Sequence, residues 1–464
     1  MGRKPKNQTK IKEISKGMKQ NKLIPRLRGM RDVLQDEYRY WELIVSKAKS
    51  IIDYYGFNKT EIPFIENLAL YERSTGKQTD VVSKEMYTFV DKDNDKIAIR
   101  PEATPGLVRS YIEHGMFNLP IQPVKLYWIG HLLRREKPQA GRYRQFSQID
   151  LEIFGEESSV ADAQLILIAC NLFKELQLNV EVQINSIGCK ECRPDYIKKL
   201  TEYYKQRRTK SKLCEDCKKR LLKNPMRLLD CKEEGCEETK REAPQIIDHL
   251  CDSCRDHFVK VLEYLDELDV PYSLNPYLVR GLDYYNRTVF EFWPSDNKNE
   301  EQAENNQASE GEQDYNQQNR QGALGGGGRY DDLVEYMGGR PTPACGYALG
   351  VERMILKIKE NNSLIAESGK PDIFVAQLGD IAKRKAMVFF EELRKRGYKA
   401  SQNFVKDNLK AQLELANKLG VKMTLILGQK ELMDGTILIR DMESGMQEVY
   451  DFKKVFEELD KRLK

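Results

Sequence analysis

Long apolar runs are missing from this sequence of 464 residues. No stretch approaches the roughly 20 consecutive apolar residues that a membrane-spanning helix needs, and the beginning of the chain lacks the apolar segment of a secretory signal. A protein with ten cysteines and no such signal is expected to keep its thiols reduced in the cytoplasm. The composition therefore predicts a cytoplasmic protein with no membrane partner.

A strong overall charge is also missing, because the formal net charge is only +4. The charge is unevenly distributed: residues 1–28 hold ten Lys or Arg and one acid, so the rest of the chain is net negative. We expect residues 1–22 to be a disordered basic tail, since a chain of this composition cannot bury enough apolar surface to fold. Two interpretations stay open, a solvated extension and a loose contact with a polyanion.

The length exceeds what one compact domain usually holds, so two or three domains are expected. An amphipathic helix is predicted over residues 36–55 and ends at Gly56. Strand-like runs follow at residues 59–65, 86–90, 96–100, 126–129, 145–154, 272–278 and 288–293. Few helices separate these runs, which indicates an α+β fold with a largely antiparallel sheet flanked by helices, and not a doubly wound sheet.

Two polar stretches mark boundaries in the second half of the chain. Residues 294–321 contain almost no aliphatic side chains, so we predict a disordered loop that interrupts a hairpin. A second boundary lies near 361–371. Beyond it, short apolar runs alternate with helices, which predicts a small α/β domain at 371–464 with a mostly parallel sheet.

The run RREKPQAGRYRQFSQIDLEIF, residues 134–154, is the most informative segment. Side chains of a strand alternate between its faces, so Gln148, Asp150 and Glu152 share one face between Phe146 and Phe154. Such a strand is often just half exposed. Arg134 lies across a basic loop and would bring a guanidinium to the same face, where its planar fork suits phosphate oxygens.

Further strings place polar groups at junctions between elements. RPEAT (100–104) puts Glu102 and Thr104 where a strand meets a helix; Thr104 is expected to cap that helix, and Glu102 to turn into a pocket. The glycine run of GGGGRY (325–330) fits a phosphate-binding loop, or an ordinary tight turn or bulge, and it is not a Walker loop because no Lys-Ser/Thr follows.

Taken in order and spacing, these strings resemble class II aminoacyl-tRNA synthetases. GF..TEIP (56–63), the Arg134-Arg135-Glu136 hairpin and GYALGVER (346–353) are similar to the three signature motifs of that class. RPEAT, LVRGLDYY (278–285) and GGRYD (327–331) resemble histidyl-tRNA synthetases specifically, over residues 23–464. Departures at Leu133, Ala103 and Asp332 leave only loop geometry in doubt.

The resemblance implies a domain plan and a set of partners. It implies a catalytic domain at 23–188 and 259–360 with six or seven antiparallel strands, an inserted Cys-rich module at 189–258, and an anticodon-binding domain at 371–464. A homodimer formed through the first motif around Pro63 is expected. The implied reaction joins L-histidine to tRNA(His) with ATP and Mg²⁺, through a histidyl-adenylate.

Site residues follow from the same resemblance. Three arginines would hold the phosphates of ATP, with Arg134 and Arg280 at the α-phosphate and Arg353 at the γ-phosphate. Glu136 and Phe146 complete the ATP site, with Phe146 stacking on adenine. Six residues would bind histidine: Glu102, Thr104 and Gln148 at the α-amino group, Glu152 and Tyr285 at the imidazole, and Tyr284 beside them.

Eight of the ten cysteines form close pairs in the inserted module, and the other two are Cys170 and Cys345. The pairs are Cys189/Cys192, Cys214/Cys217, Cys231/Cys236 and Cys251/Cys254. This spacing is typical of tetrahedral thiolate sites, so the module is predicted to hold structural Zn²⁺ in up to two sites, whose grouping the sequence leaves open. The alternative is a helical insert with unused thiols.

A basic surface is predicted between residues 198 and 227, where twelve Lys or Arg stand against three acids. It is either a solvated helix face or a clamp on the phosphates of the tRNA acceptor stem. Two non-synthetase alternatives remain, a regulatory subunit of ATP phosphoribosyltransferase and an RNA-binding pseudo-synthetase. The domain at 371–464 and the complete set of ATP-binding arginines both argue against them.

Overall fold

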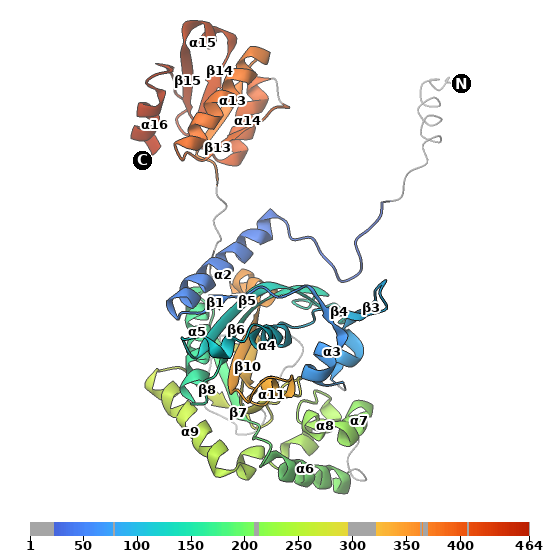
Figure 1. Cartoon of the computed structure of the whole chain (residues 1–464). Helices are drawn as coiled ribbons and strands as arrows, with labels where there is room; N and C mark the ends of the chain where they lie inside the picture. The colour runs from blue at the N-terminus through green and yellow to red at the C-terminus, as the bar shows by residue number, and fades with distance from the viewer. Residues whose placement is uncertain are drawn as a thin grey trace, which may run out of the picture. The chain divides into compact units, whose positions relative to one another are not determined.

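A computed structural model describes residues 23–77, 79–207, 213–295, 322–361, 364, 370–405 and 408–463. The chain divides into two compact units, Met1–Leu364 and Ile365–Lys464 (Figure 1). The predicted basic tail and all of the predicted polar loop except its first two residues lie outside the described part of the chain. Among the described residues, no helix is both long enough and apolar enough to cross a membrane.

An eight-stranded sheet forms the centre of the first unit. Its strands in spatial order are β1 (Asn58–Lys59), β5 (Val124–Leu133), β6 (Gln145–Phe154), β11 (Ala344–Gly350), β10 (Gly325–Arg329), β9 (Asn286–Pro294), β7 (Val180–Ser186) and β8 (Tyr272–Leu274). The inner neighbours all pair antiparallel, and only the short outer strands β1 and β8 pair parallel. The predicted antiparallel sheet is confirmed, with eight strands where the resemblance implied six or seven.

Strand β6 has the alternation expected from its sequence. Ile149, Leu151 and Ile153 are fully buried, and β6 pairs along its whole length with β5, from Gln145↔Leu133 to Phe154↔Val124. On its other side it pairs with β11 from Gln148↔Gly350 to Phe154↔Ala344. Both edges of β6 are therefore hydrogen-bonded, which fixes the direction of every side chain on it.

Helices cover the sheet on the side of its apolar residues. α2 (Gln35–Tyr54) packs against α5 (Val160–Glu175) and α12 (Val351–Asn361), and these in turn pack against β11 and β6 (Figure 1). Helix α2 ends before Gly56, whose φ of +73° agrees with the predicted stop.

A three-stranded sheet of β2 (Ile65–Asn67), β4 (Lys96–Ile99) and β3 (Tyr87–Val90) precedes α4 (Thr104–Glu113). The prediction that Thr104 caps α4 is wrong. Ala103 occupies the N-cap position without a side-chain cap, and Thr104 is the first helical residue. Its hydroxyl instead donates to Glu152, because the helix begins directly over the polar face of β6.

The Cys-rich module is helical and lies at one end of the first unit (Figure 1). It contains α6 (Arg193–Arg207), α7 (Glu215–Lys223), α8 (Glu234–Arg241) and the beginning of α9 (Asp252–Glu267). Tyr196 and Leu200 of α6 belong to the same continuous apolar core as Tyr285 and Tyr330, which lie beside the central sheet. The module is thus packed against the part of the sheet that carries the pocket.

The second unit is a five-stranded sheet with helices packed against it. Its strand order is β13 (Ala400–Gln402), β12 (Ile373–Gln377), β14 (Met423–Leu427), β15 (Thr436–Asp441) and β16 (Gln447–Asp451). Its helices are α13 (Asp380–Lys395), α14 (Leu409–Leu419), α15 (Gln429–Asp434) and α16 (Val455–Leu463). The predicted mostly parallel sheet is corrected to a mixed one, because β15 and β16 pair antiparallel.

Candidate active site and cysteine clusters

A cavity lies over the central sheet because the middle strands carry very small residues there. On the face shared with Gln148, Asp150 and Glu152 of β6, the partners on β11 are Gly350, Ala348 and Gly346. Ala348 and Gly346 in turn pair with Gly326 and Gly328 of β10. Small side chains on two adjacent strands leave a hollow between the larger side chains of β6 and β9.

This arrangement corrects one expectation about the glycine run. Gly325–Arg329 is strand β10, so it is neither a loop nor a tight turn, although the pairing with β9 shifts register between Gly328 and Arg329, as the bulge alternative allows. A Cβ on Gly326 would meet the Arg280 guanidinium at 2.7 Å, and one on Gly346 would overlap the Glu152 carboxylate. These glycines therefore serve close approach of charged side chains to the backbone of the sheet.

All eleven residues predicted to bind histidine or ATP line this one cavity. They are Glu102, Thr104, Arg134, Glu136, Phe146, Gln148, Glu152, Arg280, Tyr284, Tyr285 and Arg353. They come from the start of α4, the loop after β5, strand β6, the segment before β9 and the first turn of α12. Segments far apart in sequence thus converge on one face of one sheet.

Four buried carboxylates line the cavity, with exposures of 4% for Glu102, 1% for Asp150, 1% for Glu152 and 7% for Glu352. Glu152 accepts hydrogen bonds from the hydroxyls of Thr104, at 2.7 Å, and Tyr330. Glu102 accepts one from Thr75 through Oε1 at 3.4 Å. Within the described part of the chain, Glu102 Oε2 and Asp150 Oδ2 have no hydrogen-bond partner.

Burial disfavours the charged forms of these carboxylates. It raises the pKa of Glu102 to about 7, although the nearby Arg134 guanidinium acts in the opposite direction. It raises the pKa of Glu152 to about 8, against the hydrogen bonds from Tyr330 and Thr104. The pKa of Asp150 is also raised, first by burial and then by the neighbouring Glu152. Such a group of acceptors favours a ligand that brings positive charge and N–H donors.

Three arginines supply the opposite charge in the same cavity. Arg134 donates to the carbonyl of Pro101 at 2.8 Å, and its guanidinium lies 5.4 Å from the centre of the Phe146 ring. Arg280 pairs with Glu291, and its Nε has no partner among the described residues. Arg353 donates to the carbonyl of Ala323. Each guanidinium is thus held in place while part of it faces the cavity.

The two kinds of charge lie towards different ends of β6. Phe146 and Glu152 are six residues apart on one face, a separation of roughly 20 Å at about 3.3 Å per residue. Arg134 lies against Phe146. Arg353 follows shortly after Gly350, the partner of Gln148, and so lies towards the same end. Arg280 lies between the two ends, because its guanidinium is next to Gly326, which is level with Ala348 and Asp150. The cavity therefore has a cationic end at Phe146, an acidic end at Glu152, and Arg280 between them.

The cavity is also lined by residues that were not among the predicted site residues, among them Asp150, Arg227, Glu291 and Tyr330. Asp150 shares the polar face of β6, and Tyr330 lies within GGRYD, so both carried a signal that could have been used. Arg227 comes from the Cys-rich module, and its Nη2 lies 3.9 Å from Asp80 and 3.2 Å from Asp230. Its location depends on tertiary packing that no local pattern reveals.

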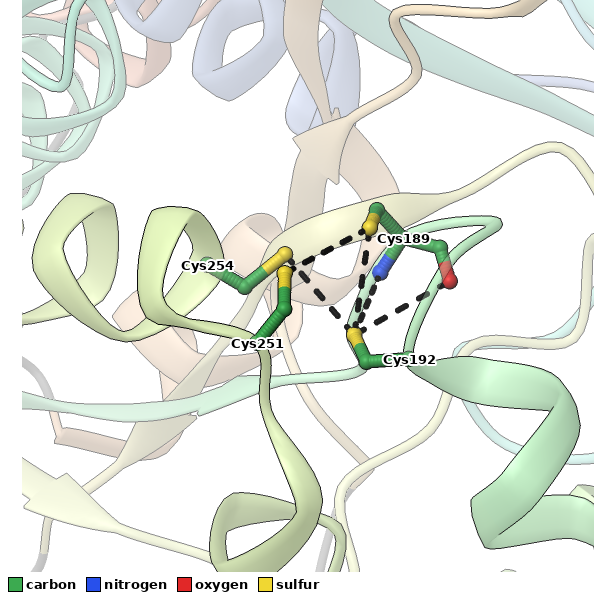
Figure 2. Close-up of side chains that lie close together, drawn as sticks. All are labelled: Cys189, Cys192, Cys251 and Cys254. Atoms are coloured by element: carbon green, nitrogen blue, oxygen red, sulfur yellow. Dashed lines mark hydrogen bonds between the residues drawn. The ribbon is translucent and has the colours of Figure 1, made fainter.

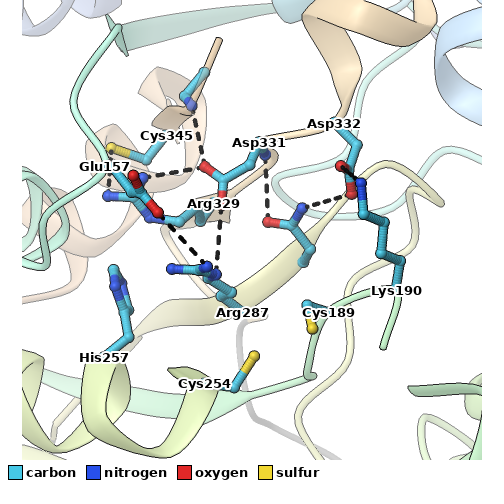
Figure 3. Close-up of polar contacts among 12 residues, drawn as sticks. Glu157, Cys189, Lys190, Cys254, His257, Arg287, Arg329, Asp331, Asp332 and Cys345 are labelled. Atoms are coloured by element: carbon cyan, nitrogen blue, oxygen red, sulfur yellow. Dashed lines mark hydrogen bonds and ion pairs between the residues drawn. The ribbon is translucent and has the colours of Figure 1, made fainter. Parts of the chain in front are cut away.

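A network of charges surrounds Arg329, and Figure 3 shows part of it, including Asp331, Arg287 and His257. Arg329 is fully buried and donates to Asp162 through Nε at 3.1 Å, while its Nη1 lies 3.1 Å from Asp331. Burial alone would raise the pKa of Asp162, but Arg329 and His257 outweigh it and lower the pKa to about 2. Arg329 directly precedes Tyr330, so this network fixes the backbone that carries the Tyr330 hydroxyl to Glu152.

The eight paired cysteines form two groups of four. The base cluster comprises Cys189, Cys192, Cys251 and Cys254, and the tip cluster comprises Cys214, Cys217, Cys231 and Cys236. In each cluster the four sulfurs lie within 4.8 Å of one another, and all eight thiols are free of disulfides. Both clusters could hold a metal ion, and the structure thus supplies the grouping that the sequence left open.

Comparison with known proteins agrees with this site. A histidyl-tRNA synthetase family model matches residues 29–302, and an anticodon binding domain model matches residues 372–462. A histidine–tRNA ligase of Dehalococcoides mccartyi is 41% identical, over 94% of this chain and 99% of that protein. One of Natranaerobius thermophilus is also 41% identical, over 90% and 94% respectively.

A solved structure adds agreement in three dimensions. The apo histidyl-tRNA synthetase of S. aureus is similar with a TM-score of 0.74 and 31% identity, over 94% of this chain and 99% of that one. The histidyl-tRNA synthetase of a Nostoc species shares the fold, with a TM-score of 0.61 at 19% identity. The chain therefore belongs to the histidyl-tRNA synthetase family.

Proposed function

We propose that this protein attaches L-histidine to tRNA(His) in two steps, the activity of the ligases that it resembles. An oxygen of the histidine carboxylate attacks the α-phosphorus of ATP, a new P–O bond forms, and the bond to pyrophosphate breaks. A hydroxyl of the tRNA 3′-terminal ribose then attacks the acyl carbon, and AMP leaves. The observation that carries this proposal is a single cavity with an acidic end and a cationic end.

The acidic end suits histidine itself. The unpartnered Oε2 of Glu102 is an acceptor for the α-ammonium group, with Thr104 and Gln148 beside it. Glu152 and Tyr285 would bracket the imidazole, and Tyr284 would pack next to them. Tyr330 orients the Glu152 carboxylate. A pocket of fixed polar partners rejects apolar amino acids, because each wrong occupant leaves these partners unpaired.

The cationic end suits ATP. Arg134 and Arg280 would hold the α-phosphate, and Arg353 the γ-phosphate, while the Phe146 ring would stack on adenine. Fixed guanidinium groups stabilise the charge that develops on the α-phosphate during attack, without reorganising. ATP enters as its Mg²⁺ complex; Glu136 and Glu291 supply carboxylate oxygens at this end, the ligand type that Mg²⁺ prefers.

The inserted module and the second unit would bind the tRNA. Basic residues of α6 and α7, among them Lys205 and Arg220, give the module charges suited to phosphates of the acceptor stem. The second unit, matched by the anticodon-binding model, would read the other end of the tRNA. The thiols and the tRNA substrate both fit a cytoplasmic location.

We also propose that the protein is a homodimer. The three-stranded sheet next to the first motif exposes large apolar side chains, with Phe64 43%, Ile65 51%, Phe89 49% and Val90 61% exposed. Clustered apolar side chains of this kind mark an interaction surface. Sedimentation velocity is expected to give the mass of two chains for the natural protein and of one chain for Phe89→Glu.

Structural zinc is the remaining part of the proposal. Four thiolates at about 2.3 Å from a tetrahedral zinc ion lie about 3.8 Å apart. Three Sγ···Sγ separations in the base cluster are 3.8 to 3.9 Å, and the one between Cys214 and Cys231 in the tip cluster is 3.8 Å. Metal analysis of protein washed with a mild chelator should find two zinc ions per chain, and fewer than one would contradict the assignment.

The catalytic proposal is tested by histidine-dependent exchange of pyrophosphate into ATP. The natural protein should exchange with histidine and not with the other amino acids, and it should then charge tRNA(His). Arg353→Ala should lower the exchange rate, whereas the exposed Arg394→Ala in the second unit should leave it unchanged. Folded protein that shows no exchange would exclude the synthetase function and favour a regulatory role.

A further inference from the structure

The base cluster brings together the beginning and the end of the Cys-rich module. Cys189 and Cys192 follow strand β7, whereas Cys251 and Cys254 lie at the beginning of α9, 62 positions further along the chain. Figure 2 shows the four sulfurs facing one another. The separations are 3.8 Å for Cys189–Cys192, 3.8 Å for Cys189–Cys251 and 3.9 Å for Cys192–Cys254.

The backbone around the base cluster also suits bound thiolates. The N–H of Cys189 donates to the Cys192 sulfur at 3.3 Å, and the N–H of Glu191 donates to the Cys189 sulfur at 3.4 Å. Such bonds stabilise negative charge on sulfur. Four irons in a cluster would hold the thiolates further apart, so the short separations favour one tetrahedral ion, and a thiolate set of this geometry favours zinc.

The loop that carries two of these ligands is hydrogen-bonded to the wall of the histidine pocket. The N–H of Ile187 donates to the carbonyl of Arg287 at 2.7 Å. The N–H of Arg287 donates to the carbonyl of Gly188 at 2.9 Å. Arg193, the residue after Cys192, donates to the carbonyls of Gly188 at 2.9 Å and Tyr285 at 2.7 Å. One half-buried guanidinium therefore joins the metal-binding loop to the backbone of a pocket residue.

A second connection runs through the segment that carries Tyr330 (Figure 3). Lys190 lies 3.6 Å from Asp332, which accepts a hydrogen bond from Asn286 at 3.1 Å. Asn286 in turn accepts from the N–H of Asp331 at 3.3 Å. Tyr330, directly before Asp331, donates to Glu152 in the pocket. Both sides of the proposed imidazole site are thus linked to residues 187–193.

We infer, on the basis of the proposed function, that the zinc ion of the base cluster positions the wall of the histidine pocket through Arg193 and Tyr285. Losing this ion frees the 187–193 loop, and the polar groups that surround the imidazole lose their fixed positions. The tip cluster lies inside the module, between α7 and α8, and has the same ligand chemistry. The module segment next to this cluster contacts the catalytic side from Asn224 to Asp283 and from Arg227 to Asp80, and within the described part of the chain it makes no hydrogen bond to Tyr285 or Tyr330.

The two clusters therefore form a matched pair for an experiment on the full-length protein. Cys251→Ser/Cys254→Ser removes two base ligands, and Cys214→Ser/Cys217→Ser removes two tip ligands. Each double variant should lower bound zinc from two ions per chain to one. In pyrophosphate exchange without tRNA, the base variant should raise the histidine KM about tenfold or more. Its ATP KM, and both KM values of the tip variant, should change by less than about twofold.

A single substitution distinguishes a displaced pocket wall from a misfolded module. Arg193→Gln leaves all eight thiolates in place, so it should keep two zinc ions per chain and still raise the histidine KM about tenfold, because the Tyr285 carbonyl loses its donor. Cys251→His, which offers another zinc ligand, should restore both zinc and the natural KM relative to Cys251→Ser.

Specific outcomes would overturn the inference. An unchanged histidine KM in the base variant and in Arg193→Gln would do so, as would equal increases in the base and tip variants, or a base cluster that binds no zinc. Failure of the proposed function is a different result: the natural protein would bind two zinc ions and show no histidine-dependent exchange.

Discussion

Glu102 carries the strongest single-residue prediction, because one of its buried oxygens has no partner among the described residues. A hydrogen bond to a charged group contributes about 1.5–3 kcal/mol, so Glu102→Gln should raise the histidine KM roughly 10- to 100-fold. Pyrophosphate exchange measures this change, and the ATP KM should stay close to that of the natural protein. Glu113→Gln, which alters an exposed carboxylate paired with Arg109, is the matched control. An unaltered histidine KM in Glu102→Gln would remove Glu102 from the α-amino site.

The pKa of Glu102 also predicts how histidine binding depends on pH. Burial raises this pKa to about 7 in the empty pocket, so a proton competes with the α-ammonium group below that value. Because the ionised form is the one that binds, affinity should increase with pH, by roughly tenfold between pH 6 and pH 8. Calorimetry over this range measures the slope. In Glu102→Gln the slope should shrink to the part caused by Glu152, whose pKa is about 8, and by the imidazole of the free ligand, and an identical slope would contradict the assignment.

At the scale of elements, the close packing around strand β11 predicts which of its glycines can be replaced by alanine. A Cβ on Gly346 would overlap the Glu152 carboxylate, and β11 cannot move away because it is hydrogen-bonded to β6 and β10. Gly346→Ala should therefore displace Glu152 and cost about 1–3 kcal/mol, in histidine binding, in stability or in both. Exchange kinetics and thermal unfolding measure the two parts. Gly350→Ala on the same strand is the control, since its Cβ would meet no atom closer than 3.5 Å; equal behaviour of the two variants would refute the argument.

Strands with regular alternation could be predicted from sequence, and elements fixed by tertiary contacts could not. β6 has the predicted bounds because its pattern has a period of two over ten residues. The glycines of β10 carry no such pattern, since their role depends on Arg280 and Tyr347 opposite them. Thr104 is a residue type that often caps helices, yet its hydroxyl donates a hydrogen bond to the buried Glu152. The strands β15 and β16 were missed because their short mixed sequences lack a clear period.

The residues of the candidate site were likewise only partly predictable from the sequence. Phe146, Gln148 and Glu152 share a face by the strand period alone. Arg134, Glu102 and Thr104 were noticed from local patterns, whereas the binding role of each of the eleven predicted residues came from resemblance to a family. Neither the strand period nor the family resemblance identified Arg227 and Glu291. Only the packing of the module and the pairing of β9 with β10 bring them to the cavity. The cysteine pairs were visible in the sequence, but their grouping depends on which helices begin side by side.

At the scale of the whole molecule, the cavity belongs to one unit and the region matched by the anticodon-binding model belongs to the other. The first unit contains the entire cavity and both cysteine clusters, while the second has its own apolar cores around Leu425 and around Phe374. A chain ending at Leu364 should therefore fold and keep histidine-dependent pyrophosphate exchange, because adenylate formation needs no residue beyond that point. Charging of tRNA(His) should fall sharply, since the unit matched by the anticodon-binding model is gone. Comparing exchange and charging rates in one preparation tests both statements, with circular dichroism as the check on folding. A folded truncated chain that lost exchange would show that the second unit takes part in the first step, and one that charged tRNA at the natural rate would show that this unit does not bind it.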